Sequence, residues 1–168
     1  MNCKFTNDLS DGITQKPILI SGKKSIHFSK TEYVLIEQGN NSIPYEIRYE
    51  YSCSPFKDAL IENEILAVGF EEKFYLFDIS KNKSILSLKV KGYFGHLYLH
   101  DDLFYVADAY GLYCVNKVGY ILWYNSNIAI DGVIVNKFEG NKIYVQGEQN
   151  PPDNWEYFVL DLATGEKI

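Results

Sequence analysis

The chain has 168 residues, of which 46% are hydrophobic and 15% aromatic, and its formal net charge is −6. This length and apolar content suffice for one domain with a sizeable core. An acidic chain repels phosphate backbones, which argues against general nucleic-acid binding. No stretch approaches the roughly 20 apolar residues that a membrane-spanning helix requires.

Composition and the first residues also predict a compartment. The sequence starts with polar residues and has no apolar core of a secretory signal. Its three cysteines, Cys3, Cys53 and Cys114, are odd in number and have no C-x-x-C spacing, so we expect reduced thiols and a cytoplasmic protein.

The N-terminal segment 1–54 has strand-like runs without a clear repeat. Apolar and β-branched residues gather at 17–20, 33–36 and 45–49, and a polar turn lies at 39–42. We expect this segment to form either a degenerate repeat or a cap on the sheets that follow, because terminal repeats are often atypical.

From residue 55 onward the sequence repeats itself about every 38 residues. Val68, Val106 and Val145 mark equivalent strands and lie 38 and 39 residues apart. The period divides the rest of the chain into repeats at 55–92, 93–130 and 131–168, all within a single domain 1–168. In the first repeat, strands are expected at 56–61, 65–69, 74–77 and 85–90.

The second and third repeats keep the same plan with one irregularity. Strands are expected at 97–99, 103–106, 112–115 and 119–123, then at 132–138, 142–145 and 157–160. Asn116 follows Asp78 by 38 residues, whereas Asp161 follows Asn116 by 45. We assign the surplus to an insertion at 148–154 in one hairpin loop, where it disturbs a sheet least.

Two stretches resemble blades of the quinoprotein-type (PQQ-like) β-propeller family. The segment Gly111–Trp123 has that family's strand, short glycine turn and strand ending in Trp, and Phe158–Ile168 contains its Asp-x-x-Thr-Gly hairpin. Phe74–Asp78 is a weaker copy. The resemblance implies an all-β fold: a partial, open propeller-like array of about three to four antiparallel sheets, or alternatively a compact four-bladed ring. Because closed propellers have 4–8 blades, so short an arc lacks the axial pocket for a quinone, and we expect no cofactor.

Candidate catalytic and metal residues do not form a convincing set. His96 and His100 lie about 13 Å apart on an extended strand, too far to share a zinc ion. Cys114 lies between Tyr113 and Val115 and resembles a small buried hydrophobe. Asp78 opens a segment that lacks the glycine and the final glutamate of a calcium loop, so we expect it to cap a hairpin. The prediction is therefore no catalytic, metal or cofactor residue.

One group of residues forms a candidate partner-binding surface. In stacked repeats, the turns between second and third strands lie in a row at one end of the sheets. Carboxylates with aromatic rings among them suit a protein partner of basic charge. The predicted row consists of Glu71, Glu72, Asp108, Tyr110, Glu148, Asp153 and Trp155. A second acidic row, flanked by lysines, is expected at the opposite end: Glu62, Glu64, Asp101, Asp102 and Glu139.

Three functions follow from these features. The chain loosely resembles the bacterial immunity proteins that neutralise toxins, because it is small and acidic and has no catalytic motif. The first hypothesis is therefore an inhibitor that covers the active-site cleft of a basic toxin, such as a nuclease. The second is a scaffold or adaptor module with neutral partners. The third is a small enzyme with a cluster such as Glu72, Asp108 and His96. The first is preferred, and it requires no nucleic acid, membrane or cofactor.

Overall fold

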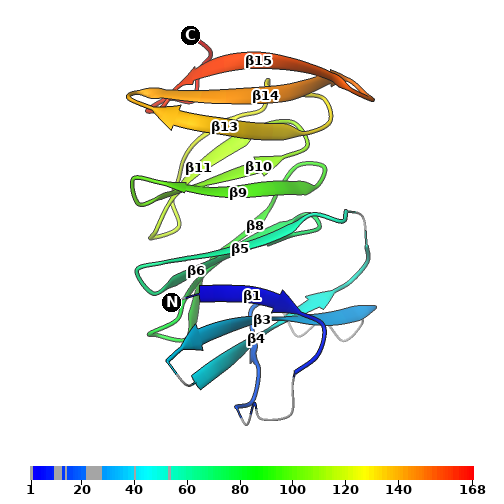
Figure 1. The fold of residues 1–168 in the computed structure, drawn as a ribbon, viewed down its shortest axis with the longest axis vertical. Helices are drawn as coiled ribbons and strands as arrows, with labels where there is room; N and C mark the ends of the chain where they lie inside the picture. The colour runs from blue at the N-terminus through cyan, green and yellow to red at the C-terminus, as the bar shows by residue number, and fades with distance from the viewer. Residues whose placement is uncertain (1, 10–12, 14, 22–27, 40, 53) are drawn as a thin grey trace.

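The computed structural model describes residues 2–9, 13, 15–21, 28–39, 41–52 and 54–168. Within them the chain forms four separate β-sheets, which stack one above another along the long axis of the molecule (Figure 1). The first and last sheets lie at opposite ends of the stack. The expected all-β, open propeller-like array is therefore confirmed, and the chain does not close into a four-bladed ring. The described residues include no helix long and apolar enough to cross a membrane.

The N-terminal segment contributes a complete sheet of its own. Its strand order is β1-β3-β4-β2, and the short β2 runs parallel to β4 while the other pairs are antiparallel. The sequence indicated all of these strands except β1, which lies beside β3. The bounds are Asn2–Thr6 for β1, Ile18–Leu19 for β2, Lys30–Gln38 for β3 and Asn41–Tyr49 for β4.

Each of the three repeats contains one antiparallel sheet, and the strands follow one another in chain order across it. In the second sheet these are β5 (Lys57–Glu62), β6 (Ile65–Phe70), β7 (Lys73–Asp78) and β8 (Lys83–Lys89). In the third sheet they are β9 (Phe94–His100), β10 (Leu103–Asp108), β11 (Leu112–Asn116) and β12 (Ile121–Asn125). The fourth sheet has β13 (Val133–Glu139), β14 (Lys142–Asn150) and β15 (Asn154–Asp161).

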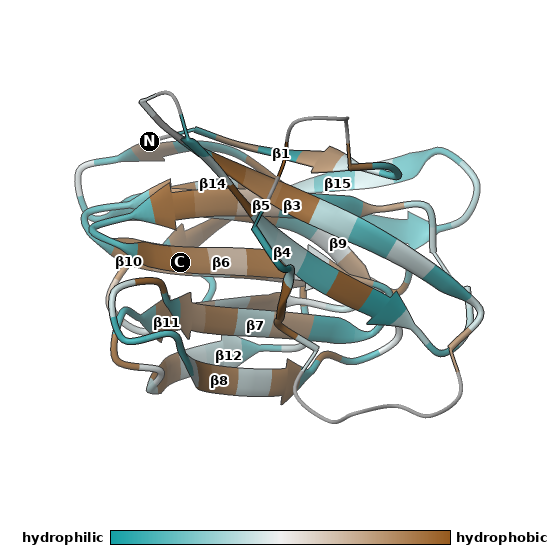
Figure 2. Cartoon of the chain, turned by 90° about the horizontal axis from the view of Figure 1, so that it is seen from below, coloured by the Kyte–Doolittle hydropathy of each residue, from teal (hydrophilic) through white to brown (hydrophobic). Residues whose placement is uncertain are grey.

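The sheets are held together by apolar residues that alternate between the two faces of each strand. In β6, Leu66 and Val68 pack against the first sheet, whereas Ile65 and Ala67 pack against the third. All six residues of β6 are consequently buried. The same alternation in β10 joins the third sheet to the second and fourth, so three cores lie between four sheets. Apolar residues accordingly concentrate in the strands, and polar residues lie mainly at the turns (Figure 2).

The repeated Asp or Asn at the end of the third strand closes the turn that follows it. The Asp78 carboxylate accepts hydrogen bonds from the Ser80 hydroxyl and the Lys81 amide, at 2.7 and 2.9 Å. Asn116 and Asp161 accept amide hydrogen bonds in the same way from the residues after them. The Asx turn explains why this position carries a short polar side chain in every repeat.

The irregular spacing has a different cause from the one expected. Residues 148–154 do not form a loop insertion: β14 extends to Asn150, β15 begins at Asn154, and Glu148 pairs with Trp155. The additional residues lengthen the hairpin, because extra ladder hydrogen bonds satisfy their backbone groups. The fourth sheet lacks a full fourth strand, but Lys167 forms a bridge to Leu160 at that position.

The close approach of successive sheets predicts that a larger residue at position 147 destabilises the fold. A Cβ atom there would lie 2.1 Å from the carbonyl oxygen of Ile128, which belongs to the backbone connecting two sheets. We expect Gly147→Ala to lower the free energy of unfolding by about 1–3 kcal/mol, the usual cost of overpacking. Urea denaturation followed by circular dichroism measures this.

Gly95→Ala is the matched control. Its Cβ would meet only ordinary contacts, the nearest at 3.5 Å from the Ala107 carbonyl oxygen, so we expect a change within about 0.5 kcal/mol. Equal stability of the two variants would contradict the close packing described here.

Candidate partner-binding surface

The turns that carry the predicted row lie side by side. Backbone hydrogen bonds run from one to the next through the segments that connect successive sheets, so the turns after β6, β10 and β14 share one end of the stack. The donors and acceptors are Phe94 N to Glu71 O (2.5 Å), Ala109 N to Tyr93 O (3.1 Å), Gly132 N to Ala109 O (2.6 Å) and Glu148 N to Gly132 O (3.1 Å).

Asp108 belongs to this end of the stack, but it cannot contact a partner. The residue is completely buried. Its carboxylate accepts hydrogen bonds from the amides of Lys91, Tyr110 and Gly111 at 2.7–3.0 Å, and from the Tyr124 hydroxyl. Burial raises the pKa of Asp108, although these donors oppose the rise. Its inclusion in a binding surface was wrong: it holds the β10–β11 turn to the preceding connection.

The two glutamates of the β6–β7 turn also differ from the expectation of free surface charges. Glu71 is buried, and its carboxylate accepts a hydrogen bond from the Ser54 amide at 3.1 Å. Glu72 is partly exposed, but it pairs with Lys89 at 2.7 Å and accepts a hydrogen bond from the Tyr51 hydroxyl. Hydrogen bonds from Lys89 and Tyr51 lower the pKa of Glu72. The acidic character of the surface therefore comes mainly from the other turns.

The remaining predicted residues gather around the last two sheets. Tyr110 is 41% exposed. Asp153 is exposed, and its amide donates to the Glu148 carboxylate at 2.8 Å, which fixes the tip of the β14–β15 hairpin. Trp155 is half-buried beside Gly132, where a Cβ atom would lie 3.4 Å from the indole ring.

Two further residues, which sequence reasoning missed, complete this cluster. The Tyr93 hydroxyl donates to the Asp131 carboxylate at 2.8 Å, and a Cβ atom at Gly132 would lie 3.6 Å from the same hydroxyl. Tyr93 and Trp155 therefore approach each other over Gly132. We call the whole cluster the turn-end surface; it consists of Tyr93, Tyr110, Asp131, Glu148, Asp153 and Trp155.

The missed residues lie in connections between sheets, not in hairpin turns. A four-stranded antiparallel sheet ends its fourth strand at the same end as its second strand. The connections 90–93 and 126–132 must therefore cross the end that carries the β6–β7 and β10–β11 turns. The strand order expected from the sequence was therefore sufficient to place Tyr93 and Asp131 at this end of the stack.

The electrostatics of the turn-end surface are dominated by carboxylates. Burial, the hydrogen bond to Asp131 and the negative charges of Asp131 and Glu148 raise the pKa of Tyr93 well above its usual range. A neutral phenol therefore lies beside two carboxylates. Such an arrangement attracts a cation, which gains both charge pairing and contact with aromatic faces.

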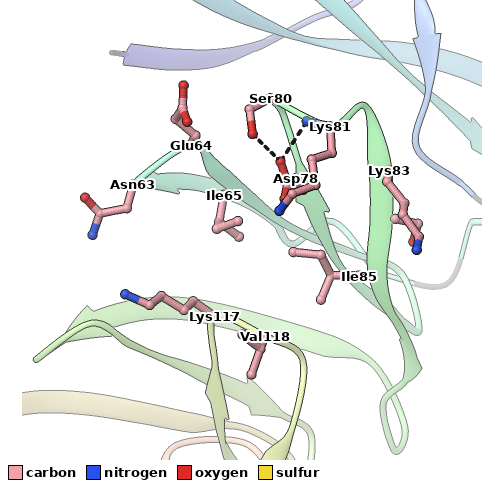
Figure 3. Close-up of a pocket in the computed structure, with 11 residues that line it drawn as sticks. Asn63, Glu64, Ile65, Asp78, Ser80, Lys81, Lys83, Ile85, Lys117 and Val118 are labelled. Atoms are coloured by element: carbon pink, nitrogen blue, oxygen red, sulfur yellow. Dashed lines mark hydrogen bonds and ion pairs between the residues drawn. The ribbon is translucent and has the colours of Figure 1, made fainter.

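The opposite end contains a cavity of about 600 Å³ between the second sheet and the β11–β12 turn. Figure 3 shows Ile65, Ile85 and Val118 on its walls and Lys117 at its lower edge. Lys81 is paired with Asp78 at 2.7 Å. Lysines alternate here with the carboxylates of the second acidic row, and the weaker field expected at this end stays a prediction.

Asp108 is bound to backbone amides and Glu72 to Lys89 and Tyr51, so neither carboxylate is engaged with His96. Its ring lies 5.6 Å from that of Phe56, and its charge affects the Asp58 carboxylate. Asp58 accepts hydrogen bonds from the amides of Ala59 and Leu97, so it joins β5 to β9.

The two thiols in the described part of the chain both have raised pKa values. Burial and the negative charge of Asp58 raise the pKa of Cys3, whose thiol donates to the Ala59 carbonyl at 3.3 Å. Burial raises the pKa of Cys114 to about 11, whereas a reactive cysteine needs a lowered one. Both are free cysteines, and Cys53 lies outside the described residues.

A charged cluster around the buried Glu32 joins the first two sheets. Glu32 is 1% exposed, and it pairs with Lys30 and with Lys57 (2.8 Å) and accepts a hydrogen bond from the Tyr49 hydroxyl (2.6 Å). Burial alone would raise the pKa of Glu32, but these hydrogen bonds outweigh it and lower the pKa to about 2. Every oxygen of the carboxylate has a partner, so the cluster is a structural connection.

Comparisons with known proteins add no functional information. No protein-family model matches the sequence, and no curated protein matches it either. Among the described residues, no group of three or more histidine, cysteine, aspartate or glutamate side chains is placed to hold a metal ion. The geometry of the turn-end surface is therefore the main basis for a functional proposal.

Replacement of Asp108 tests its structural role. Asp108→Ala leaves several buried amides without an acceptor, and we expect it to lower the free energy of unfolding by about 3 kcal/mol in urea denaturation. Asp108→Asn retains one acceptor oxygen but turns an amide group toward the Lys91 amide, so about half that loss is expected. The control is Asp8→Ala at an exposed residue. Wild-type stability in both Asp108 variants would refute this role.

The lowered pKa of Glu32 predicts how the free energy of unfolding changes in acid. Its pKa falls from the ordinary 4.5 to about 2 in the folded protein, so the stabilisation is complete above pH 4.5 and is lost as pH falls toward 2. We expect Glu32→Gln to cost about 3 kcal/mol at pH 7 and to flatten this part of the stability–pH curve.

Chemical denaturation at a series of pH values between 2 and 7 gives that curve. Glu37→Gln, at the exposed pair with Lys4, is the control, with a change below about 0.5 kcal/mol at neutral pH. Parallel curves for wild type and Glu32→Gln would contradict the prediction.

Proposed function

We propose that this protein is a non-catalytic inhibitor of the immunity type, which neutralises a basic partner protein by covering its active-site cleft with the turn-end surface. The partner is a toxin domain that acts in the cytoplasm, and a nuclease is the best example because its cleft must attract phosphate. The observation that carries the proposal is the cluster of Tyr93, Tyr110 and Trp155 with the carboxylates of Asp131, Glu148 and Asp153.

The composition of the surface supports binding to protein. Tyrosine and tryptophan are the residues that most often dominate interface energies. Carboxylates beside them raise the rate of encounter with a basic partner and discriminate against acidic ones. The net charge of −6 on the whole chain adds a long-range attraction for the same basic partner.

The rigidity of the surface also supports this role. Backbone hydrogen bonds link its turns, and Asp108 holds one of them from inside. A preformed surface loses little conformational entropy on binding, which favours high affinity. Of the carboxylates named for an enzyme, Asp108 is bound to backbone amides, and Glu72 is bound to Lys89 and Tyr51.

The test is affinity capture from the native cytoplasm with the immobilised chain, followed by measurement of the captured partner's affinity and association rate. We expect a basic protein whose association slows steeply with salt. Trp155→Ala should weaken binding by at least about 30-fold, the effect of removing a central aromatic anchor. Asp153→Asn should mainly slow association, because it removes a charge and Asn tolerates the left-handed backbone found there (φ 73°).

Asp101→Asn is the matched control at the opposite end. It is also exposed and has a positive φ of 47°, but it lies in the second acidic row. We expect it to leave affinity unchanged. Neutral partners with salt-independent binding would favour the scaffold function instead. A partner that binds Trp155→Ala as tightly as wild type would refute the role of the turn-end surface.

A further inference from the structure

The outer edges of the last three sheets are protected unequally. The outermost strand of the second sheet, β8, carries Lys83 and Lys89 at its two ends. Charged residues at an edge discourage pairing with another strand. In the fourth sheet, β15 contains Glu156, and Lys167 already forms a bridge to Leu160 beside it. By contrast, β12 has no charged residue and lies at the edge of the third sheet; its pairing with β11 shifts register at Leu122, as the pairing of β8 with β7 does at Ile85.

The edge at β12 is also unusually apolar and exposed. Ile121 and Leu122 at the start of β12 are 43% and 51% exposed, and Val118 and Tyr120 in the turn before it are 61% and 70% exposed. The uncharged run extends from residue 118 to residue 130 in a chain that is 23% charged. An exposed strand edge of this kind is a template for pairing with another strand.

We propose that β12 pairs with β12 of a second copy of this chain, antiparallel about a two-fold axis, so that two four-stranded sheets become one continuous sheet. Two copies that each carry a net charge of −6 repel each other, and this uncharged edge allows contact without opposed carboxylates. A two-fold axis places the same strand on both sides, so β12 supplies its own partner.

The second copy fits better than a basic partner at this place. A basic protein gains nothing from an uncharged strand, and the carboxylates that would attract it lie on the turn-end surface. Lys117, which precedes the strand, has no carboxylate within ion-pairing distance among the described residues, and it would repel a basic chain. The dimer does not rest on the proposed function, because β12 and the turn before it contribute no residue to the turn-end surface.

The size of the contact sets the expected strength. An aromatic side chain buries on the order of 150–250 Å², and aliphatic ones lie near the lower end of that range. Four half-exposed side chains therefore present at most roughly 400 Å² per copy, about half of the area in a standard stable interface. The dimer is therefore weak, and the monomer and dimer exchange with concentration.

Sedimentation equilibrium of the full chain, under reducing conditions, tests the proposal between about 10 and 500 µM, the range in which so small an interface associates. We expect the mean mass to rise from one chain toward two. Leu122→Lys places a charge on the edge and should weaken self-association at least tenfold. Ile121→Lys, on the adjacent position of the same strand, should do the same.

Tyr157→Lys is the matched control, because Tyr157 is 77% exposed on β15, another outermost strand. It should leave self-association unchanged, and circular dichroism should show the same folded state in all variants. A monomer at every concentration would overturn the proposal. So would a dimer that Tyr157→Lys abolishes and Leu122→Lys does not, since that result places the contact on the fourth sheet.

Discussion

The burial of each sheet against the next is the constraint on which the rest of the molecule depends. Apolar side chains alternate along β6 and β10, so each central sheet contributes one face to each of two cores. In an open stack the first and last sheets do not pack against each other. The stability of the fold is therefore a sum over three interfaces between neighbouring sheets. Glycine stands where another backbone segment approaches closely, as at Gly111 and Gly147, where a Cβ atom would lie about 2 Å from backbone oxygens.

Polar side chains add a second level of connection between neighbouring sheets. The Tyr98 hydroxyl accepts a hydrogen bond from the Val135 amide, and the Trp123 indole donates to the Leu162 carbonyl. Buried polar groups require hydrogen-bond partners. The carboxylates of Glu32, Asp58 and Asp108, which could otherwise serve in catalysis, are therefore hydrogen-bonded within the fold. Side chains that remain available for function therefore lie at turns and connections, outside the cores.

The sequence predicted the periodic part of the fold because the signals are local. The spacing of Val68, Val106 and Val145 places the central strands, and Asp78, Asn116 and Asp161 mark the turns. β1 was missed because its residues alternate only weakly and it pairs with β3, about thirty residues away. Asp108 was misplaced because one of its donors, Lys91, belongs to the preceding connection, which strand periodicity does not describe. The sequence thus predicts in which sheet a strand lies. It does not predict whether a turn side chain is buried, because that depends on which connecting segment crosses the turn.

The separation between cores and turns gives a physical reason for a binding role. A substitution at Tyr110 or Asp153 changes the turn-end surface without altering the apolar alternation that holds the sheets together. An inhibitor must match one partner closely, and its surface residues must vary while the fold stays the same. Hairpin tips linked by backbone hydrogen bonds meet both needs, because those bonds use groups that every residue except proline has. In the proposed function, the architecture fixes where a partner meets the chain, and the side chains at those positions determine which partner it is.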